Sequence, residues 1–312
     1  MVESEFYYSS ADHKTGIHAV KWLPEGTPRA VLQIAHGVTE HILCYRELAE
    51  YFTKRGFVVV GNDHLGHGSS IAKDSEPMYF GGKNSWFTAE RDLYTCRKLM
   101  KRQYPDIPYI ILGFSLGSFL VRTLLIRHPG KADAAILAGT GQIPLLQLKI
   151  AEYMAKKEAR RAGEQYTTPL IQKLTFETYN RQFAPNRTKC DWLCASEEGL
   201  QRYLDDPLRG EAMSAGLFRE LLNGMHYTGS IKNQRQMDTT MPILLLSGDN
   251  DPVGANGKGV RKVYTTMKKA GVQNISKKLY PGLRHDIFLE DERYNVFGDI
   301  EKWINQQCAV AE

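Results

Sequence analysis

The chain has 312 residues, of which 42% are hydrophobic and 24% are charged, as in an ordinary globular protein. Its net charge of +5 is small beside 40 basic and 35 acidic residues, so the composition does not indicate a nucleic-acid partner. No apolar run is long enough for a transmembrane helix, and the acidic, polar start MVESEFYYSS lacks the pattern of a signal peptide.

The cysteines do not indicate a disulfide framework. They are odd in number and scattered along the chain, at Cys44, Cys96, Cys190, Cys194 and Cys308. Such cysteines are typical of reduced thiols, and we therefore expect a cytoplasmic protein. Cys190 and Cys194 could form a metal-binding pair, but no second pair accompanies them, and two ordinary thiols are the simpler interpretation.

Short apolar segments alternate with longer segments of helical periodicity along most of the chain. Nearly continuous apolar runs predict strands at Ala30–His36, Phe57–Asp63, Tyr109–Phe114, Ala134–Thr140 and Pro242–Gly248, and KKLYPG at Lys277–Gly282 is a candidate for a sixth. Helices are predicted at Cys44–Arg55, Ser85–Tyr104, Leu116–His128 and Tyr294–Gln307. Strands that are apolar on both faces are typical of a parallel sheet. Their alternation with helices predicts an α/β fold with helices on both faces of a mostly parallel sheet.

One part of the chain breaks this alternation. Residues 141–225 contain no convincing buried strand, and they are helical, charged and rich in aromatic residues. They lie between the fourth and fifth predicted strands. We therefore expect residues 1–140 and 226–312 to form the core, with residues 141–225 as a helical insertion that lies over the strand ends as a cap.

Ser115 lies in the sequence G-F-S-L-G, between Gly113 and Gly117. The pattern G-x-S-x-G alone is weak, but here a predicted strand enters it and a predicted helix leaves it. A serine at such a turn has a strained backbone, and glycines two residues away on either side remove side chains that would collide. A serine that merely caps the helix is the alternative, but that role explains neither glycine. The context therefore predicts a nucleophile.

A serine nucleophile needs a base and an orienting acid, which follow it in the order acid, then base. The candidate bases are His226, which precedes the fifth strand, and His285, which follows the last strand; we favour His285. The acid should follow the fifth strand, where Asp249 and Asp251 both lie. The residues alone favour Asp251 only slightly, because Pro252 fixes the backbone there. Asp286 follows the base and has the wrong order.

The oxyanion of an acyl-transfer reaction needs two backbone donors. The residue after the nucleophile supplies one, the N–H of Leu116. The second should come from the loop after an early strand, and Val38, after the flexible Gly37, is the candidate. His36 and His41 are metal ligands by type, but they lack a helical spacing and a third ligand, so we predict no metal there.

With these residues assembled, the chain resembles the α/β-hydrolases, and within them the monoacylglycerol lipase and lysophospholipase group, whose bacterial members are often labelled serine aminopeptidase-like. The resemblance covers nearly the whole chain. It depends on H-G-V-T-E-H (36–41), D-H-L-G-H-G-S-S (63–70), G-F-S-L-G (113–117), S-G-D-N-D-P-V (247–253) and R-H-D (284–286).

The resemblance implies an α/β-hydrolase fold with a helical cap between late strands. In that group the acid is the third residue after the glycine that ends the strand, which here is Asp251. The group's base corresponds to His285, and its oxyanion donors to Val38 and Leu116. Two features depart from the group: Phe114 precedes the nucleophile, where histidine is frequent, and P-N-R-T-x-x-D-W-L (185–193) resembles uncharacterised bacterial relatives more than the animal lipase.

These observations predict a serine hydrolase that cleaves carboxylic esters through an acyl-enzyme, with neither cofactor nor metal. The expected substrate is a single-acyl lipid of the monoacylglycerol or lysophospholipid type. An acyltransferase would use the same triad, and so would a serine aminopeptidase or amidase, which would need acidic residues such as Asp205 and Asp206 to hold a free amine. A binding protein on this scaffold is the third class, and the intact triad argues against it.

The expected cap also suggests a contact with membranes. Its residues Lys156, Lys157, Arg160 and Arg161 form a basic helix face that could rest transiently against anionic lipid. A solvated helix face is the simpler interpretation of the same four charges.

Overall fold

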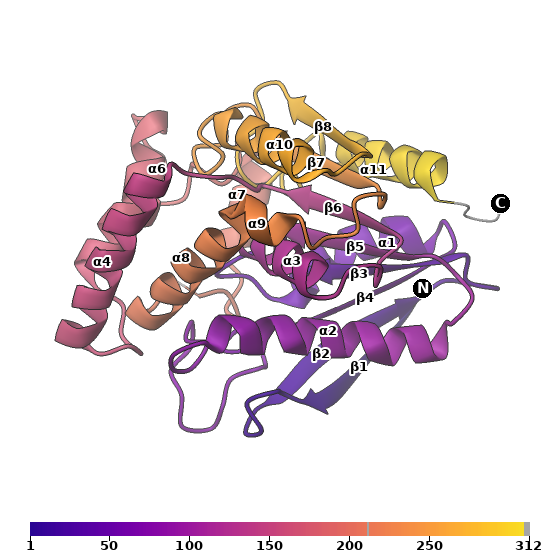
Figure 1. Ribbon diagram of the computed structural model, residues 1–312, viewed down its shortest axis with the longest axis horizontal. Helices are drawn as coiled ribbons and strands as arrows, with labels where there is room; N and C mark the ends of the chain where they lie inside the picture. Colours follow the sequence, from indigo (N-terminus) through magenta and orange to yellow (C-terminus); the bar gives the residue numbers. More distant parts are fainter. Residues whose placement is uncertain (211, 309–312) are drawn as a thin grey trace.

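The computed structural model describes residues 1–210 and 212–308. Eight strands form one sheet in the order β1-β2-β4-β3-β5-β6-β7-β8. The strands span Val2–Ser9 (β1), Gly16–Leu23 (β2), Ala30–Ala35 (β3), Phe57–Asn62 (β4), Tyr109–Phe114 (β5), Ala134–Ala138 (β6), Ile243–Gly248 (β7) and Ile275–Tyr280 (β8). From β4 to β8 in this order every neighbouring pair is parallel, whereas β2 runs antiparallel to both β1 and β4. The expected α/β fold is therefore confirmed, and Figure 1 shows the twisted sheet at its centre.

Helices cover both faces of the sheet (Figure 1). They are α1 (Arg46–Thr53), α2 (Ser85–Gln103), α3 (Leu116–Arg127), α8 (Ala215–Gly229), α9 (Ile231–Gln234), α10 (Lys258–Ala270) and α11 (Arg293–Gln307), and a 3₁₀ turn, η1 (Ile42–Tyr45), precedes α1. Alternate strand residues point to opposite faces, so two core layers form. One layer packs under α2, α3, α8 and α10, and the other under α1 and α11.

Residues 139–242, between β6 and β7, contain no strand in the part that the structure describes. Their remaining helical segments are α4 (Leu145–Ala162), α5 (Pro169–Gln172), η2 (Lys173–Glu177), α6 (Thr178–Asn180), η3 (Arg181–Phe183) and α7 (Glu197–Leu204). Helix α4 lies along α8 at the side of the molecule (Figure 1). The domain boundary that we predicted at residue 225 lies within α8, which packs on the core helices α2 and α3.

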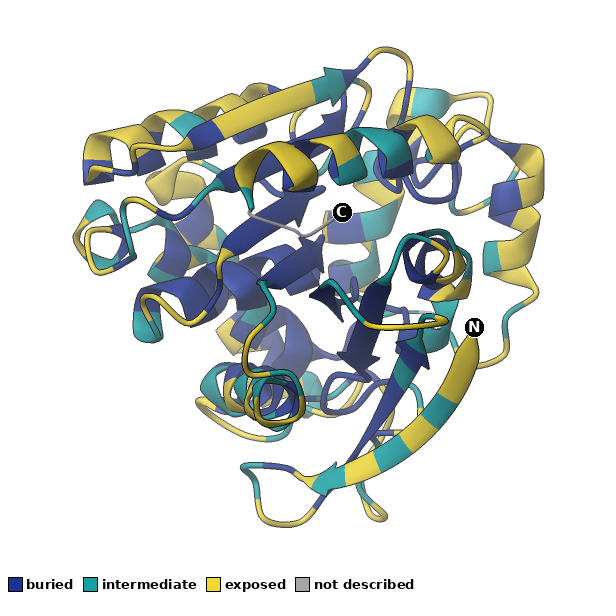
Figure 2. Ribbon diagram, turned by 90° about the vertical axis from the view of Figure 1, so that its right-hand side faces the viewer, coloured by how far each residue is buried: buried dark blue, intermediate teal, exposed yellow. Residues whose placement is uncertain are grey.

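The structure contains three core elements that the sequence did not predict. Helix α10 is one, and strands β1 and β2 are the others. Figure 2 shows β1 at the sheet edge with exposed and intermediate residues in alternation. Its outward positions are polar or solvent-exposed, so the segment lacks the continuous apolar run by which the central strands were found. Among the described residues, none of the helices is both long and apolar enough to cross a membrane.

The fold brings the carboxyl ends of the parallel strands to one edge, where sites in open α/β sheets form. Gly113 of β5 pairs with Ala35 of β3 on one side and with Leu137 of β6 on the other. The loops that follow β3, β5, β7 and β8 therefore leave the sheet on the same side, and they carry the residues of the predicted triad and of the predicted oxyanion hole.

Candidate active site

Ser115 lies at the sharp turn between β5 and α3. Its backbone has φ of 50° and ψ of −117°, a conformation that a residue with a side chain rarely adopts. A methyl group on Gly113 would lie 2.5 Å from the carbonyl oxygen of Gly117, and one on Gly117 would lie 2.0 Å from that of Ala35. Only glycine fits at either position. The Ser115 hydroxyl makes no capping hydrogen bond to α3, so helix capping does not explain this serine.

His285 connects Ser115 to an acid. Its Nε2 lies 2.9 Å from Ser115 Oγ, and its Nδ1 lies 2.9 Å from Oδ1 of Asp251. All three side chains are buried, and Asp251 is completely inaccessible to solvent. Three loops after three different strands therefore deliver one continuous chain of hydrogen bonds from hydroxyl to imidazole to carboxylate.

The loop after β7 separates its two acids. Asp251 also accepts hydrogen bonds from the N–H of Val253, at 2.8 Å, and from the Ser247 hydroxyl, at 3.1 Å, so its carboxylate is fixed on both oxygens. Asp249 points the other way and accepts the N–H of Gly282 at 2.8 Å, in the turn after β8. The structure therefore brings Asp251, and not Asp249, to His285.

The loop after β3 carries the predicted donor Val38. A carboxylate oxygen of Glu40 accepts the N–H of Gly37 at 2.7 Å and the hydroxyl of Tyr45 at 2.8 Å, which holds the loop in its bend. No pattern in the sequence singled out Glu40, which is buried and holds the residue before the expected oxyanion donor. The N–H of Leu116 stands at the first residue of α3, where the helix leaves its first amides without intrahelical partners.

Comparison with known proteins identifies the family. Residues 26–292 match the model of the family described as serine aminopeptidase, S33. The chain belongs to this family. Its fold is that of the α/β-hydrolases, as the resemblance implied.

The relatives of this S33 hydrolase include lipases and esterases. A monoacylglycerol lipase of Mycolicibacterium smegmatis is 28% identical and aligns over 91% of this chain and 90% of its own. The human monoglyceride lipase is 27% identical, with 93% and 87% of the two chains covered. A thermostable carboxyl esterase from Bacillus coagulans, solved in complex with glycerol, superposes with a TM-score of 0.90 at 26% identity, over 98% and 99% of the chains. The S33 hydrolase is a carboxylic ester hydrolase.

Three buried histidines, His36, His64 and His67, support the loop after β3. His36 accepts the N–H of His64 at 2.9 Å through Nε2, and its Nδ1 lies 2.7 Å from the carbonyl oxygen of Gly37. Burial lowers the pKa of His36, that of His64 to about 3 and that of His67 to about 4, so all three rings are neutral. Both nitrogens of His36 are occupied in this loop.

A second buried acid follows the base directly. Burial and the neighbouring Glu40 carboxylate raise the pKa of Asp286 well above its usual range, and a hydrogen bond joins the two side chains. Asp286 accepts the N–H of Phe288 at 3.1 Å and makes no contact with Ser115 among the described interactions. Asp286 therefore belongs to the support of the loops, in line with its position after the base in the sequence.

The other histidines and the cysteines lie elsewhere. His226, on α8, contacts Glu152 of α4 with a Nδ1-to-oxygen distance of 2.8 Å. His128, which the sequence analysis did not weigh, stacks on Tyr94 at a ring distance of 3.7 Å. All five cysteines are free thiols.

His41, Cys44 and Asp206 place possible ligand atoms within 4.8 Å of one another. Nε2 of His41 lies 2.8 Å from the Asp206 carboxylate, and Nε of Arg209 lies 3.6 Å from the same oxygen. The cation already beside this carboxylate opposes the binding of a metal ion. Burial also raises the pKa of the Cys44 thiol, which keeps it protonated. These residues therefore fit a hydrogen-bonded contact between His41 of the core and Asp206 of the α7–α8 connection, where Arg209 balances the carboxylate.

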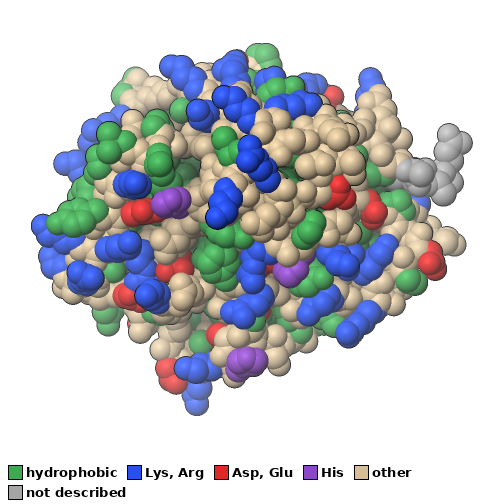
Figure 3. All heavy atoms as spheres, in the orientation of Figure 1, with side chains coloured by type: hydrophobic (Ala, Val, Ile, Leu, Met, Phe, Trp, Pro, Cys, Tyr) green, Lys and Arg blue, Asp and Glu red, His purple; other side chains and the backbone are tan. Residues whose placement is uncertain are grey.

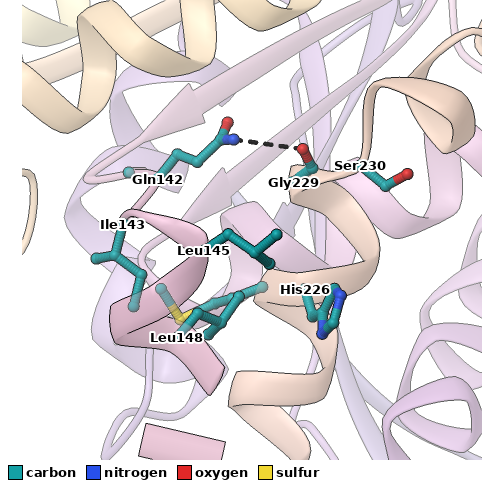
Figure 4. A pocket seen from close by; sticks show the side chains of 9 residues that line it. Gln142, Ile143, Leu145, Leu148, His226, Gly229 and Ser230 are labelled. Atoms are coloured by element: carbon teal, nitrogen blue, oxygen red, sulfur yellow. Dashed lines mark hydrogen bonds between the residues drawn. The ribbon is translucent and has the colours of Figure 1, made fainter. Parts of the chain in front are cut away.

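A pocket of about 250 Å³ opens where the chain leaves the core for α4 (Figure 4). Apolar side chains of α4 and α8 form one wall, and the amide of Gln142 spans the entrance to α4 by donating to the carbonyl oxygen of Gly229 at 3.3 Å. The pocket begins at Gly141. Only two residues earlier, a methyl group on Gly139 would lie 3.0 Å from the imidazole of His285. The pocket therefore lies close in sequence to a residue that packs on the base, although none of its lining residues belongs to the triad.

Proposed function

We propose that Ser115, His285 and Asp251 are the catalytic triad of this ester hydrolase. Ser115 attacks the ester carbonyl while His285 takes its proton and later gives it to the leaving alcohol; Asp251 holds the imidazole in the required tautomer. The acyl-enzyme then passes its acyl group to water. The observation that carries the proposal is the hydrogen-bond chain from Ser115 Oγ through His285 to Asp251, with 2.9 Å at each step.

The N–H groups of Val38 and Leu116 are the proposed oxyanion donors. Two features support this role: the Leu116 amide stands at the N-terminus of α3, which favours negative charge, and Glu40 holds the Val38 loop through Gly37. Donors fixed before the reaction need no reorganisation when charge develops on the carbonyl oxygen.

The test of the triad is the variant Ser115→Ala. We expect loss of ester hydrolysis with an unchanged thermal transition, because one buried oxygen is removed and the strained turn is kept. A fluorophosphonate probe should label the wild type at Ser115 and leave the variant unlabelled. Labelling of the variant at another serine would contradict the assignment.

The proposed substrate is a single-acyl lipid ester. One aromatic side chain of the insertion stands beside the base: the ring of Trp192 lies 5.3 Å from that of His285. Such rings offer an apolar surface to an acyl chain. The lipase relatives from M. smegmatis and human support the same choice. Hydrolysis of monoacylglycerols, lysophospholipids and p-nitrophenyl esters by one preparation, with Ser115→Ala as blank, tests it.

The aminopeptidase alternative finds less support in the site. Its candidate amine ligand Asp206 already pairs with His41 and stands next to Arg209. Asp205 is exposed and accepts a hydrogen bond from Gln201 on the same helix. Asp206 is therefore already engaged, and no described contact places Asp205 beside Ser115. Rapid cleavage of aminoacyl amides, together with slow cleavage of fatty esters, would reverse this choice.

Helix α4 is the proposed contact with a membrane surface. Its outward side exposes Leu146 and Tyr153 by 72% and 70%, and Leu145 and Ile150 by more than half. The exposed basic residues Lys149, Lys156, Lys157 and Arg160 lie on the same side, together with Arg161, which pairs with the buried carboxylate of Glu158. Glu152 turns toward α8, where it contacts His226. Figure 3 shows hydrophobic and basic side chains close together over this helix. Apolar residues that lie among cations fit an anionic lipid surface.

A further inference from the structure

The insertion reaches the catalytic histidine through one short segment, residues 191–194, which we call the Trp192 strip. Its backbone pairs with the loop that carries the base: the N–H of His285 donates to the carbonyl oxygen of Trp192 at 3.4 Å, and the N–H of Asp286 donates to that of Leu193 at 2.6 Å. The strip belongs to the motif P-N-R-T-x-x-D-W-L, to which the sequence analysis assigned no role.

The two ends of this contact are also tied. Nη1 of Arg284 donates to the carbonyl oxygens of Asp191 and Cys194, at 3.2 Å for the latter. The buried carboxylate of Glu290 accepts the N–H of Arg284 at 2.8 Å and that of Ala195 at 2.8 Å. The base loop and the strip are therefore one hydrogen-bonded unit, although about ninety residues separate them in the chain.

The side chain of Trp192 continues this contact to the imidazole itself. Its ring centre lies 5.3 Å from that of His285, at an angle of 32° between the planes. Phe114, the residue before the nucleophile, lies 5.0 Å from the same imidazole. Trp192 is 4% exposed, and its indole N–H has no hydrogen-bond partner among the described residues. A buried indole normally finds such a partner, so this ring is placed for the contact of its face.

We infer that Trp192 is a positioning residue for His285, so that the insertion takes part in assembling the triad as well as in binding the ester. The inference rests on the proposed role of His285 as base. Hydrogen bonds at Nδ1, to Asp251, and at Nε2, to Ser115, fix the imidazole at its two polar atoms, and the rings of Trp192 and Phe114 restrict its rotation. When the imidazole takes the Ser115 proton it becomes a cation, which an aromatic face stabilises.

The experiment compares Trp192→Leu, Trp192→Met and Trp192→Phe with the wild type on p-nitrophenyl acetate and octanoate. Leucine and methionine remove the aromatic face, whereas phenylalanine restores one. We expect kcat to fall about fivefold for leucine and methionine and by the same factor for both esters, because a cation–aromatic contact of this kind is worth about 1 kcal/mol. KM for the acetate should stay unchanged, and Trp192→Phe should recover most of kcat.

Phe176→Leu is the matched control, because Phe176 stacks on Trp192 without contacting His285 in the recorded aromatic pairs. It should leave kcat for the acetate within about twofold, since the proposed effect acts through the imidazole. A loss confined to the octanoate would make Trp192 a chain-binding residue and overturn the inference. If Trp192→Phe, Trp192→Leu and Phe176→Leu all lost the same share of kcat and all had a lowered thermal transition, Trp192 would be a packing residue only.

The variant His285→Ala separates this inference from the proposed function. Retained acetate hydrolysis by His285→Ala would contradict the triad itself. An inactive His285→Ala beside a Trp192→Leu variant of normal kcat would leave the triad supported and overturn the positioning role alone. Thermal transitions of all variants show which of them are folded, and either leucine or methionine suffices for the comparison.

Discussion

The strand ends of the core and the outer side of α4 differ in how far their side chains are buried and hydrogen-bonded. Ser115, Asp251 and His285 are buried, and every one of their reactive atoms has a hydrogen-bond partner. On α4, Leu146 and Tyr153 are more than two-thirds exposed and have no role in the core. The core therefore holds its reactive atoms through buried hydrogen bonds, whereas α4 offers an exposed surface.

This difference separates two properties of the enzyme. Changes at the strand ends should lower the rate for every ester alike, because they alter the chemical step. Changes in the insertion should alter which ester is used, or where the protein binds. Trp192 is the exception that joins the two regions, since it belongs to the insertion and contacts the base.

The largest effect is expected in the loop after β7, where Asp249 and Asp251 lie within three residues of each other and can be compared directly. Asp251→Asn should reduce kcat by about 10⁴ for short and long esters alike, because an amide stabilises the wrong tautomer of His285. Asp249→Asn is the matched control, and it should stay within about tenfold of the wild type, since Asp249 holds only the turn at Gly282. Steady-state kinetics on both variants decide the matter; a crippled Asp249→Asn with an active Asp251→Asn would refute the assignment of the acid.

The central part of the fold could be predicted because its local patterns are strong. The six predicted strands correspond to β3–β8. The strands β3–β7 are buried on both faces and so leave continuous apolar runs, whereas β8 is mostly exposed and its pattern is weaker. The nucleophile turn was recognisable because steric exclusion requires glycine at two fixed positions. The acid was not settled by the residues alone: both aspartates follow the same strand, and the direction of each depends on partners such as Val253 and Gly282.

The elements that escaped prediction depend on distant contacts or on weaker patterns. The contact of Trp192 with His285 joins segments that are far apart in the chain, and no local sequence pattern predicts it. Glu40 is similar, because its partners Gly37 and Tyr45 give it a role only once the loop has bent. Helix α10 had a readable signal, since Val260, Val263 and Met267 recur at helical spacing.

The next effect concerns the surface of α4. Replacing Lys156, Lys157, Arg160 and Arg161 by alanine should weaken binding to vesicles of anionic phospholipid by roughly 100-fold, because each cation near such a surface contributes about 1 kcal/mol or less. kcat for a soluble ester should not change. Co-sedimentation with vesicles at low and at physiological salt measures the effect, which should shrink as salt is added.

Helix α10 supplies the control for that experiment. Its exposed residues Arg261, Lys262, Lys268 and Lys269 can also be replaced by alanine, which removes four positive charges from a helix of the core instead of from the insertion. If this second variant loses vesicle binding as strongly as the first, net charge and not the side of α4 is responsible. Equal binding of all three proteins to neutral and to anionic vesicles would end the proposal of a lipid surface.

A smaller effect is expected in the pocket between α4 and α8. Ile143→Trp should fill part of its volume of about 250 Å³ and lower kcat/KM for a long-chain ester by roughly 10-fold relative to acetate, since each excluded CH₂ forfeits up to about 0.8 kcal/mol. Leu146→Trp adds the same ring at an exposed position outside the pocket, and it should leave kcat/KM for the long-chain ester relative to acetate unchanged. An unchanged chain-length profile in Ile143→Trp would show that the acyl chain lies elsewhere.

The smallest effect lies at the junction of the two regions, where Asp286 meets Glu40 and Arg209. Burial and the Glu40 carboxylate raise the pKa of Asp286 above its value in the unfolded chain. The folded state therefore binds a proton that the unfolded state has released, and Asp286 lowers stability progressively as the pH rises above about 4, the unfolded value, toward the folded one. An asparagine at this position stays neutral at every pH and can still donate to Glu40.

Asp286→Asn should therefore match the wild type in thermal stability near pH 4 and exceed it increasingly toward pH 8. For a chain of this size, 1 kcal/mol corresponds to about 2 °C in the melting temperature, so a gain of about 2–4 °C at pH 8 is expected. Asp205→Asn makes the same chemical change at an exposed site and should show no such trend. Melting curves from pH 4 to 8 measure both, and a difference that stays constant with pH would mean that Asp286 does not hold its proton in the folded protein. Such a result would also change the contrast between the core and the insertion. Asp286 and Glu40 would then be two buried negative charges, balanced by Arg209 from the segment after α7. The core and the insertion would meet in an ion cluster and not in a shared proton.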